Sequence, residues 1–249
     1  MTASGRPGRT SSRSGPGSDD SAAAMEALYP FLYSGSESNL DSVLAEVRQS
    51  TVAKAREITE LRQRIAGQDS ARLVSCAQQM ASRFAAGGRL LAFGNGGSAT
   101  DAQELATLFL NPGVGERPLP AFCLDNDTAV LTALCNDIGV EVVFARQLAA
   151  FGHPQDIAVG LSTSGNSENL LRALEEAARR GMLTVGIAGY DGGKMAELDA
   201  LDYLFVAPSA SVHRIQEAQT TMYHALWELT HRQLQTEVVM LCAWVSLAS

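Results

Sequence analysis

The sequence has no excess of positive charge. Its 249 residues include 19 Lys and Arg against 27 Asp and Glu, which gives a formal net charge of −8. A chain with this balance has no general positive field to hold a nucleic-acid backbone or an anionic membrane surface. We therefore expect no nucleic-acid partner and no membrane partner. An anionic small molecule must then be held by local donors.

Cysteines are few, and no two of them lie close together in the sequence. Cys76, Cys123, Cys135 and Cys242 form neither a Cys-x-x-Cys pair nor a Cys/His cluster. Their apolar surroundings predict reduced residues in the core. Because unpaired cysteines are typical of a reducing compartment, we expect a cytoplasmic protein.

The sequence also lacks an apolar run long enough to span a membrane. Residues 238–248 (VVMLCAWVSLA) are apolar but fall well short of the ~20 residues that a span needs. We interpret the apolar C-terminal tail, 237–249, as a core or subunit-interface segment. Residues 1–24 are rich in Gly, Ser and Arg and contain no apolar signal core, so we expect a disordered tail there.

Short apolar runs alternate with helical patterns through most of the chain. Apolar residues at helical spacing predict a long amphipathic helix that begins near Leu40 and extends past Ile65, and a second helix from Asp69 to Ala86. From Arg89 onward the pattern changes to strands and helices in turn. We expect strands at 90–93, 121–124, 157–161, 183–188 and 203–207, and helices near 98–110, 127–136, 141–150, 167–180 and 212–234.

This alternation predicts a parallel sheet, because each crossover between parallel strands needs a connecting helix. The expected fold class is α/β, a doubly wound five-stranded parallel sheet flanked by helices, with extra N-terminal helices. We expect one domain over 38–236, made of N-terminal helices (38–86) and an α/β core (89–236). Ligands of such sheets bind beyond the carboxyl ends of the strands.

A glycine-rich loop, Phe93–Ser98 (FGNGGS), follows the first expected strand. Its glycines let the backbone turn sharply and approach a ligand closely. Ser98 is a predicted N-cap, with Asp101 three residues later in a capping-box position. The free N–H groups of the first helical turn favour an oxyanion. A capped turn that binds no ligand remains the alternative.

A second loop, Ser162–Ser167 (STSGNS), follows the third expected strand. Its hydroxyl and N–H donors match a phosphate monoester, and neither a Walker lysine nor an obvious magnesium carboxylate accompanies them. The pattern therefore favours binding of a sugar phosphate over cleavage of a nucleotide. The alternative is an ordinary Ser/Thr-rich helix cap.

Four segments occur in a fixed order: FGNGGSATDAQ, LSTSGNSENLL, GYDGGKM and HRIQEAQTTMYH. They resemble the sugar-isomerase (SIS) domain family, in its phosphoheptose isomerase branch, over about residues 40–234. The resemblance implies the SIS fold, a five-stranded parallel sheet flanked by helices, and a homotetramer with active sites at subunit interfaces. It also implies a phosphorylated sugar as ligand and conversion of sedoheptulose 7-phosphate to a heptose 7-phosphate.

The same resemblance implies roles for individual residues. The substrate site would be lined by Asn95, Gly96, Gly97, Ser98, Asn136, Asp137 and Gln216, and the phosphate would be held by Ser162, Thr163, Ser164 and Ser167. Gln216 and His224 match two zinc ligands of the branch. His224 also matches its catalytic acid/base.

The sequence departs from the family pattern on the helix after the first loop. The family carries a His and a Glu there, four residues apart, as zinc ligands, and the Glu is also the catalytic base. This chain has Glu104 and Leu108 at those positions. We predict that Glu104 acts as the base and His224 as the acid. A zinc held by Glu104, Gln216 and His224 would occupy an oxygen-rich, weaker site.

Two other functions remain open. A non-catalytic SIS protein senses sugar phosphates or serves as an adaptor for a protein partner, and loss of the family Glu at Leu108 favours that interpretation. The segments FGHPQD and GYDGGKM are also similar to those of SIS proteins that associate with the bacterial replication initiator. A dinucleotide fingerprint can also be written with Gly94, Gly96 and Ala99, and with Asp125 as a ribose partner. We expect no nucleotide cofactor, because the second loop favours a sugar phosphate.

Overall fold

The computed structural model describes residues 40–248, and side chains are described for 41–236. The chain divides into two compact units, 1–53 and 54–249. In the first unit residues 40–53 are helical, and the side chains of Val43, Leu44 and Val47 are exposed. The second unit contains the sheet and the candidate site. The predicted disordered tail, 1–24, lies outside the described residues.

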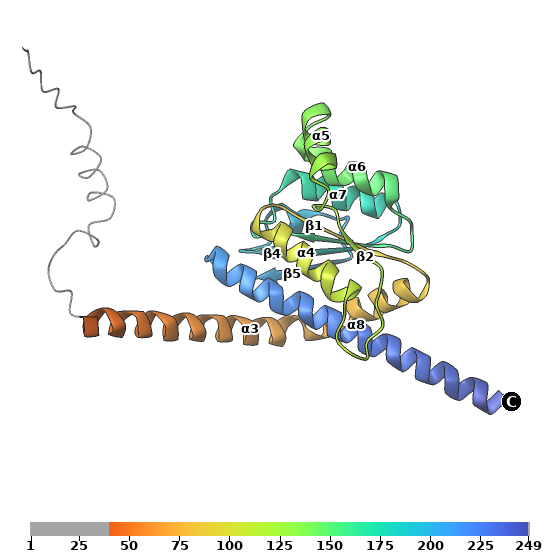
Figure 1. Cartoon of the computed structure of the whole chain (residues 1–249), viewed down its shortest axis with the longest axis horizontal. Helices are drawn as coiled ribbons and strands as arrows, with labels where there is room; N and C mark the ends of the chain where they lie inside the picture. The colour runs from red at the N-terminus through yellow and green to blue at the C-terminus, as the bar shows by residue number, and fades with distance from the viewer. Residues whose placement is uncertain (1–39, 249) are drawn as a thin grey trace, which may run out of the picture. The chain divides into compact units, whose positions relative to one another are not determined.

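The second unit is built on a five-stranded sheet, and every pairing in it is parallel (Figure 1). The strands are β1 (Leu90–Gly94), β2 (Ala121–Cys123), β3 (Ile157–Leu161), β4 (Leu183–Gly189) and β5 (Tyr203–Ala207). Their spatial order is β2-β1-β3-β4-β5. The predicted fold class and all five predicted strands are confirmed.

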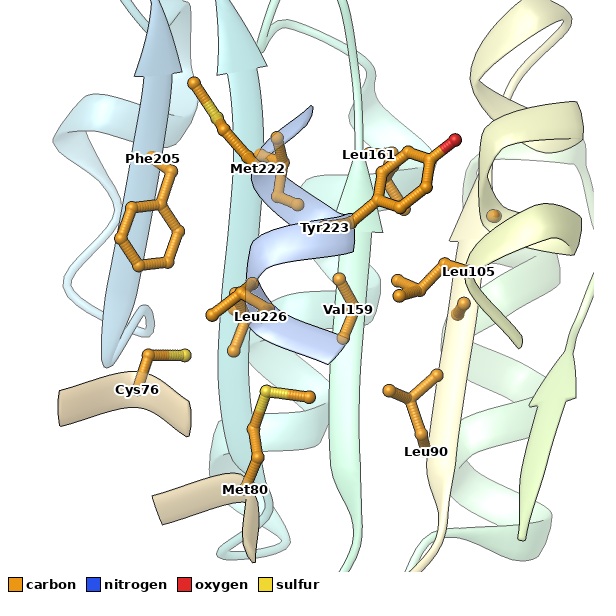
Figure 2. Close-up of a cluster of buried hydrophobic side chains, with 14 of the residues drawn as sticks. Cys76, Met80, Leu90, Leu105, Val159, Leu161, Phe205, Met222, Tyr223 and Leu226 are labelled. Atoms are coloured by element: carbon orange, nitrogen blue, oxygen red, sulfur yellow. The ribbon is translucent and has the colours of Figure 1, made fainter. Parts of the chain in front are cut away.

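Helices cover both faces of this sheet, which explains why its strands are predominantly apolar; the buried Thr184 of β4 donates a hydrogen bond to the Ala200 carbonyl. β1, β3 and β4 are buried at every position, so successive side chains enter opposite cores. Leu90 and Ala92 join the core under α3 (Leu40–Ala85), α4 (Gly97–Leu110) and α8 (Val212–Ala248). Leu91 and Phe93 join the core under α6 (Val143–Phe151) and α7 (Glu168–Arg179). Figure 2 shows the first core, where Leu105, Met222 and Leu226 meet the strands.

The helices follow the predicted order, with two corrections. They are α3 (Leu40–Ala85), α4 (Gly97–Leu110), α5 (Thr128–Asp137), α6 (Val143–Phe151), α7 (Glu168–Arg179) and α8 (Val212–Ala248), with short 3₁₀ turns at Val140–Val142 and Gly193–Glu197. None of these described helices is long and apolar enough to cross a membrane.

The first correction concerns α3, which the sequence pattern divides in two. Gly67 lies inside one continuous helix, because a single glycine costs a helix only about 1 kcal/mol. Ile65 and Leu73 on either side of it enter the same core and offset that cost. The second correction concerns α8, which continues to Ala248 through the segment predicted as a separate tail.

One cysteine prediction was wrong. Cys76 and Cys123 are buried free thiols, as expected, whereas Cys135 is exposed. Its helix, α5, buries none of its residues, so an apolar sequence neighbourhood did not mean burial there. The side chain of Cys242 lies outside the described side chains.

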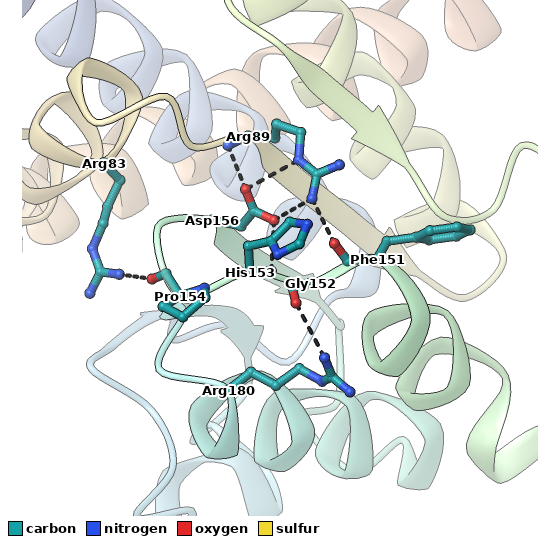
Figure 3. Close-up of polar contacts among 8 residues, drawn as sticks. All are labelled: Arg83, Arg89, Phe151, Gly152, His153, Pro154, Asp156 and Arg180. Atoms are coloured by element: carbon teal, nitrogen blue, oxygen red, sulfur yellow. Dashed lines mark hydrogen bonds and ion pairs between the residues drawn. The ribbon is translucent and has the colours of Figure 1, made fainter.

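At the amino-terminal end of the sheet, Asp156 organises a polar network (Figure 3). Its fully buried carboxylate accepts hydrogen bonds from the Arg89 guanidinium, the Arg89 N–H and the His153 N–H. Burial alone raises the pKa of Asp156, but these hydrogen bonds outweigh burial and hold the pKa below its usual value. Arg83 and Arg180 extend the network by donating to the carbonyls of Pro154 and Gly152.

Candidate functional site

The two loops singled out in the sequence lie side by side in the structure. β1 and β3 are neighbours in the sheet, and Gly94, the last residue of β1, is in register with Leu161, the last of β3. The strand order 2-1-3-4-5 reverses direction between these two strands. Such a switch point is where doubly wound sheets bind their ligands. The fold therefore places both loops at the expected ligand site.

In the first loop, glycine and not serine begins the helix. The N-cap of α4 is Gly96, with φ +57°, and Ser98 lies inside the first turn with its side chain buried. The prediction of Ser98 as N-cap was therefore wrong, since only a glycine tolerates that backbone conformation easily. The N–H groups of Ser98 and Ala99 bond to the carbonyls of Asn95 and Gly96. Among the described residues, the N–H groups of Gly96 and Gly97 have no hydrogen-bond acceptor and are available to an anion.

Asp125, the possible ribose partner of the dinucleotide interpretation, is hydrogen-bonded to the first loop. Its Oδ2 accepts a hydrogen bond from the Gly94 N–H at 3.1 Å and one from the Cys123 thiol at 3.4 Å. Burial raises the pKa of Asp125, although these hydrogen bonds partly offset the effect. Asp125 thus shapes the first loop through its Oδ2.

In the second loop, the hydroxyls of Ser162 and Ser164 form hydrogen bonds within the loop, whereas those of Thr163 and Ser167 do not. Ser162 is buried, and its Oγ accepts from the Gly165 N–H at 3.0 Å. Ser164 Oγ accepts from the Asn166 N–H at 3.3 Å. Within the described part of the chain, the side chains of Thr163 and Ser167 make no hydrogen bond. These two hydroxyls are free to bind a phosphate at the N-terminus of α7.

A pair of amides joins the two loops. Asn95 in the first loop and Asn169 in the first turn of α7 exchange two hydrogen bonds, each of 2.9 Å between Nδ2 and Oδ1. Asn169 is buried and Asn95 is exposed, so the pair is shielded from water on the α7 side only. The two loops are therefore fixed relative to each other.

A third loop supports the hydroxyl loop from the side of β4. The N–H of Lys194 donates to Asn166 Oδ1 at 2.9 Å, and the N–H of Met195 donates to the Gly165 carbonyl at 3.0 Å. Gly165 has φ +67°, and a Cβ built on it would lie 1.9 Å from the Gly192 carbonyl oxygen. The close approach of the two backbones therefore requires glycine at position 165.

We expect Gly165→Ala to destabilise the protein by about 1–3 kcal/mol, because the methyl group must separate the two loops. The same displacement moves the phosphate donors, so the affinity for inorganic phosphate should fall by about tenfold, the loss of one charge-assisted hydrogen bond. Thermal unfolding and calorimetric titration measure the two effects. Gly67→Ala, in an open part of α3, is the matched control and should be neutral or slightly stabilising. An unchanged phosphate affinity in Gly165→Ala would contradict this assignment.

Helix α8 brings the remaining candidates to the first loop. A Cβ built on Gly97 would lie 2.3 Å from Gln216 Nε2, so glycine at 97 makes room for this side chain. The buried amide of Gln219 donates to the carbonyls of Ser162 and Ile187, at 2.9 and 3.2 Å. α8 is thus anchored across the ends of β3 and β4, beside the hydroxyl loop.

Glu104 on α4 and His224 on α8, the predicted base and acid, are in direct contact. His224 Nε2 lies 3.2 Å from Glu104 Oε1, and the Tyr223 hydroxyl donates to Glu104 Oε2 at 2.8 Å. Tyr223 is fully buried, and burial raises the pKa of its phenol, so that it keeps its proton. The side chains of Glu104 and His224 are 50% and 39% exposed. Tyr223 therefore holds Glu104 from the core, and the exposed sides of Glu104 and His224 can contact a ligand.

Asp101, one turn before Glu104, is a second carboxyl group at this contact. Its Oδ2 is buried without a hydrogen-bond partner among the described residues, and the nearby amide of Gln216 favours the ionised form of the carboxyl group. Burial raises the pKa of Asp101 to about 6, and the charge of Glu104 adds to the shift. Asp101 therefore exchanges its proton close to neutral pH, beside the Glu104–His224 contact.

The residues present do not fit a four-ligand zinc site. Among residues 41–236, no three His, Cys, Asp or Glu side chains converge as metal ligands. Gln216 lies near Asp101 and Gly97, whereas His224 contacts Glu104 one turn further along α4. Leu108, at the family's glutamate position, packs against the core. We therefore derive no chemical step through a metal.

Asn136 and Asp137, predicted to meet sugar hydroxyls, lie at the end of α5 away from this cluster. Both are exposed, and Asn136 donates to its neighbour Asp137 at 2.9 Å. In the described chain no hydrogen bond joins either residue to the two loops. Their predicted contact with the sugar stays a prediction.

Sequence reasoning missed Asn169, Gln219 and Tyr223. The two residues on α8 were within reach of the sequence, because Gln216, Gln219 and Tyr223 recur at i, i+3 and i+7 on one helical face. Asn169 had no such signal, since only the packing of α7 turns its amide toward the first loop.

These observations define a class of protein. A doubly wound parallel sheet carries two loops joined by an amide pair at its switch point, and a carboxylate and an imidazole meet beside them. Such a site is typical of a sugar-phosphate-binding α/β protein. The family profile described as "SIS domain" matches residues 55–189.

Individual relatives agree with the profile. The phosphoheptose isomerase of Nitratidesulfovibrio vulgaris (strain DSM 19637 / Miyazaki F) is 44% identical over 195 residues, which cover 78% of this chain and 93% of the relative. The solved phosphoheptose isomerase GmhA from Neisseria gonorrhoeae is 35% identical with a TM-score of 0.68, over 74% of this chain and 98% of that one. A phosphoheptose isomerase from Francisella tularensis is 30% identical with a TM-score of 0.70, over 75% and 98%. The chain belongs to the SIS-domain family, among the phosphoheptose isomerases.

Proposed function

We propose that this protein interconverts the ketose and aldose forms of a sugar phosphate, with sedoheptulose 7-phosphate as the ketose. The contact between Glu104 and His224 beside the two loops carries the proposal, because isomerisation needs one group to take a proton and one to give it. The relatives named phosphoheptose isomerase support the choice of a seven-carbon sugar.

The two loops hold the phosphorylated end of the sugar. The open hydroxyls of Thr163 and Ser167 and the N-terminus of α7 supply the donors for the phosphate. The free N–H groups of Gly96 and Gly97 face the sugar from the first loop. Local donors of this kind bind an anion even though the chain has a net charge of −8.

The chemistry is a pair of balanced proton transfers. The Glu104 carboxylate takes a proton from C1 of the ketose while protonated His224 gives one to the C2 oxygen, which produces an enediol. Glu104 then returns its proton to C2, and His224 recovers one from the C1 hydroxyl as the aldehyde forms. Both side chains end in their starting states, so the cycle needs no other reactant.

A second copy of the chain completes the site in this proposal, as a homotetramer. Glu104 and Leu108 line a hollow of about 540 Å³ on α4, which a second copy would close against water. An apolar groove of about 310 Å³ between α3 and α8 supports such an interface; it is lined mainly by Ile65, Ala66, Leu73, Val74, Ala218, Met222, Ala225 and Leu229. Light scattering measures the mass directly, and a monomer would contradict the proposal.

The buried free thiols of Cys76 and Cys123 support a cytoplasmic location, which cell fractionation would check.

The direct test is to incubate the purified protein with sedoheptulose 7-phosphate, with and without added zinc, and to follow aldose formation. We expect turnover in both conditions. Saturable binding of the sugar phosphate with no turnover in either condition would overturn the isomerase proposal. That result would leave a non-catalytic sensor or adaptor.

A further inference from the structure

Tyr223 is a buried residue whose one polar atom points at the proposed base. The side chain is fully buried in the core between α8 and the sheet, and Figure 2 shows its hydroxyl at the edge of that core. The hydroxyl donates to Glu104 Oε2 at 2.8 Å and lies 3.3 Å from Thr220 Oγ1. Thr220 Oγ1 donates in turn to the Gln216 carbonyl at 3.0 Å. The phenol is thus fixed at both the ring and the oxygen.

Both oxygens of Glu104 already have protein partners. Oε2 accepts from Tyr223, and Oε1 lies 3.2 Å from His224 Nε2. The imidazole is itself held between two aromatic rings, stacked on Tyr223 at 5.4 Å and edge-on to Trp227 at 6.5 Å between centroids. A hydrogen-bonded triad of this kind fixes the carboxylate without a metal ion.

The other positions of the family's zinc set do not supply a replacement ligand. Leu108 offers no donor atom, and Gln216 is turned toward Asp101 and Gly97. Zinc sites that are stable in proteins use three or four convergent nitrogen, sulfur or carboxylate ligands. Here one imidazole and one carboxylate bind each other.

We propose that Tyr223 is a positioning residue that holds Glu104 against His224, and that this triad performs the isomerisation without a bound metal. The inference rests on the proposed function. It explains how the site holds its catalytic base in a chain that has Leu108 at the family's glutamate position. Tyr223 acts through Glu104, since a fully buried ring does not touch the sugar.

The zinc content of the purified protein tests whether the triad binds a metal. Wild-type protein is dialysed against zinc, desalted, and analysed for bound metal, and we expect no stoichiometric zinc. The matched control is the double variant Glu104→His with Leu108→Glu, which recreates the His, Glu, Gln and His set and should retain about one zinc per chain. About one zinc per wild-type chain would overturn the metal-free triad.

The positioning part is tested with Tyr223→Phe, which keeps the ring and removes only the hydroxyl. We expect kcat to fall by about tenfold, because one hydrogen bond to a charged group is lost. KM should stay unchanged, because the two loops that bind the sugar are intact. Tyr203→Phe is the matched control: its hydroxyl bonds Ser75 and Gln79 at the β5 edge of the sheet, and kcat should not change.

The outcomes separate this inference from the proposed function. A wild-type kcat in Tyr223→Phe would overturn the positioning role, as would a loss that appears in KM alone. If wild type converts no sugar phosphate, the proposed function fails. The zinc measurement still decides the metal-free triad in that case, because it requires no turnover.

Discussion

Glu104→Gln is expected to lower kcat/KM for the sugar phosphate by on the order of 10²–10⁴-fold, the usual contribution of a positioned general base. Glutamine keeps the size of the side chain and can still bond Tyr223 and His224, so the fold and the loops should be unaffected. His224→Asn removes the proton donor and should cause a loss of similar size. The double variant should be little worse than either single variant, because the two groups act as one unit.

These variants are measured by initial rates with a coupled aldose assay, together with calorimetric binding of the substrate. Binding should persist in both single variants, since Thr163, Ser167 and the first loop are untouched. Glu175→Gln, an exposed carboxylate on α7, is the control and should be fully active. Wild-type turnover in Glu104→Gln would show that another residue is the base.

Asp156→Ala is expected to cause the largest loss of stability, about 3–5 kcal/mol, because it leaves the Arg89 guanidinium without its buried partner. The backbone N–H groups of Arg89 and His153 lose their acceptor as well. Urea unfolding at one fixed protein concentration measures the change. Glu168→Ala breaks the exposed Arg172 pair and is the control, with an expected loss below about 1 kcal/mol.

The contribution of Asp156 should also depend on pH in a defined direction. Its pKa is lower in the folded protein than in the unfolded chain, so the ionised form stabilises the fold. The stabilisation is complete above the unfolded value of about 3.9 and is lost as the pH falls through the lower folded value. The difference between wild type and Asp156→Ala should therefore narrow on acidification. A difference that widens at low pH would contradict this assignment.

The sheet was predictable from sequence because its strands are short, predominantly apolar runs separated by helical patterns. Helix ends were less predictable, because local breakers compete with tertiary packing. Gly67 did not end α3, since residues on both sides of it enter one core. Ser98 did not cap α4, since the loop turns through Gly96.

The sequence predicted the individual loops and side chains of the candidate site but not the contacts between them. The two loops and the residues Glu104 and His224 followed from motifs and from family resemblance. Their contact did not, because it depends on how α8 packs against α4. The role of the Tyr223 hydroxyl could not be predicted for the same reason, because an aromatic residue in a helix is usually only part of the core.

The exchange of hydrogen bonds between Asn95 and Asn169 makes the two loops a single recognition unit. Each amide orients the other, so neither can turn over without breaking both bonds. An aspartate at either position would set oxygen against oxygen across the pair. Attempts to change the sugar preference of this enzyme by redesigning one loop must therefore redesign the other at the same time.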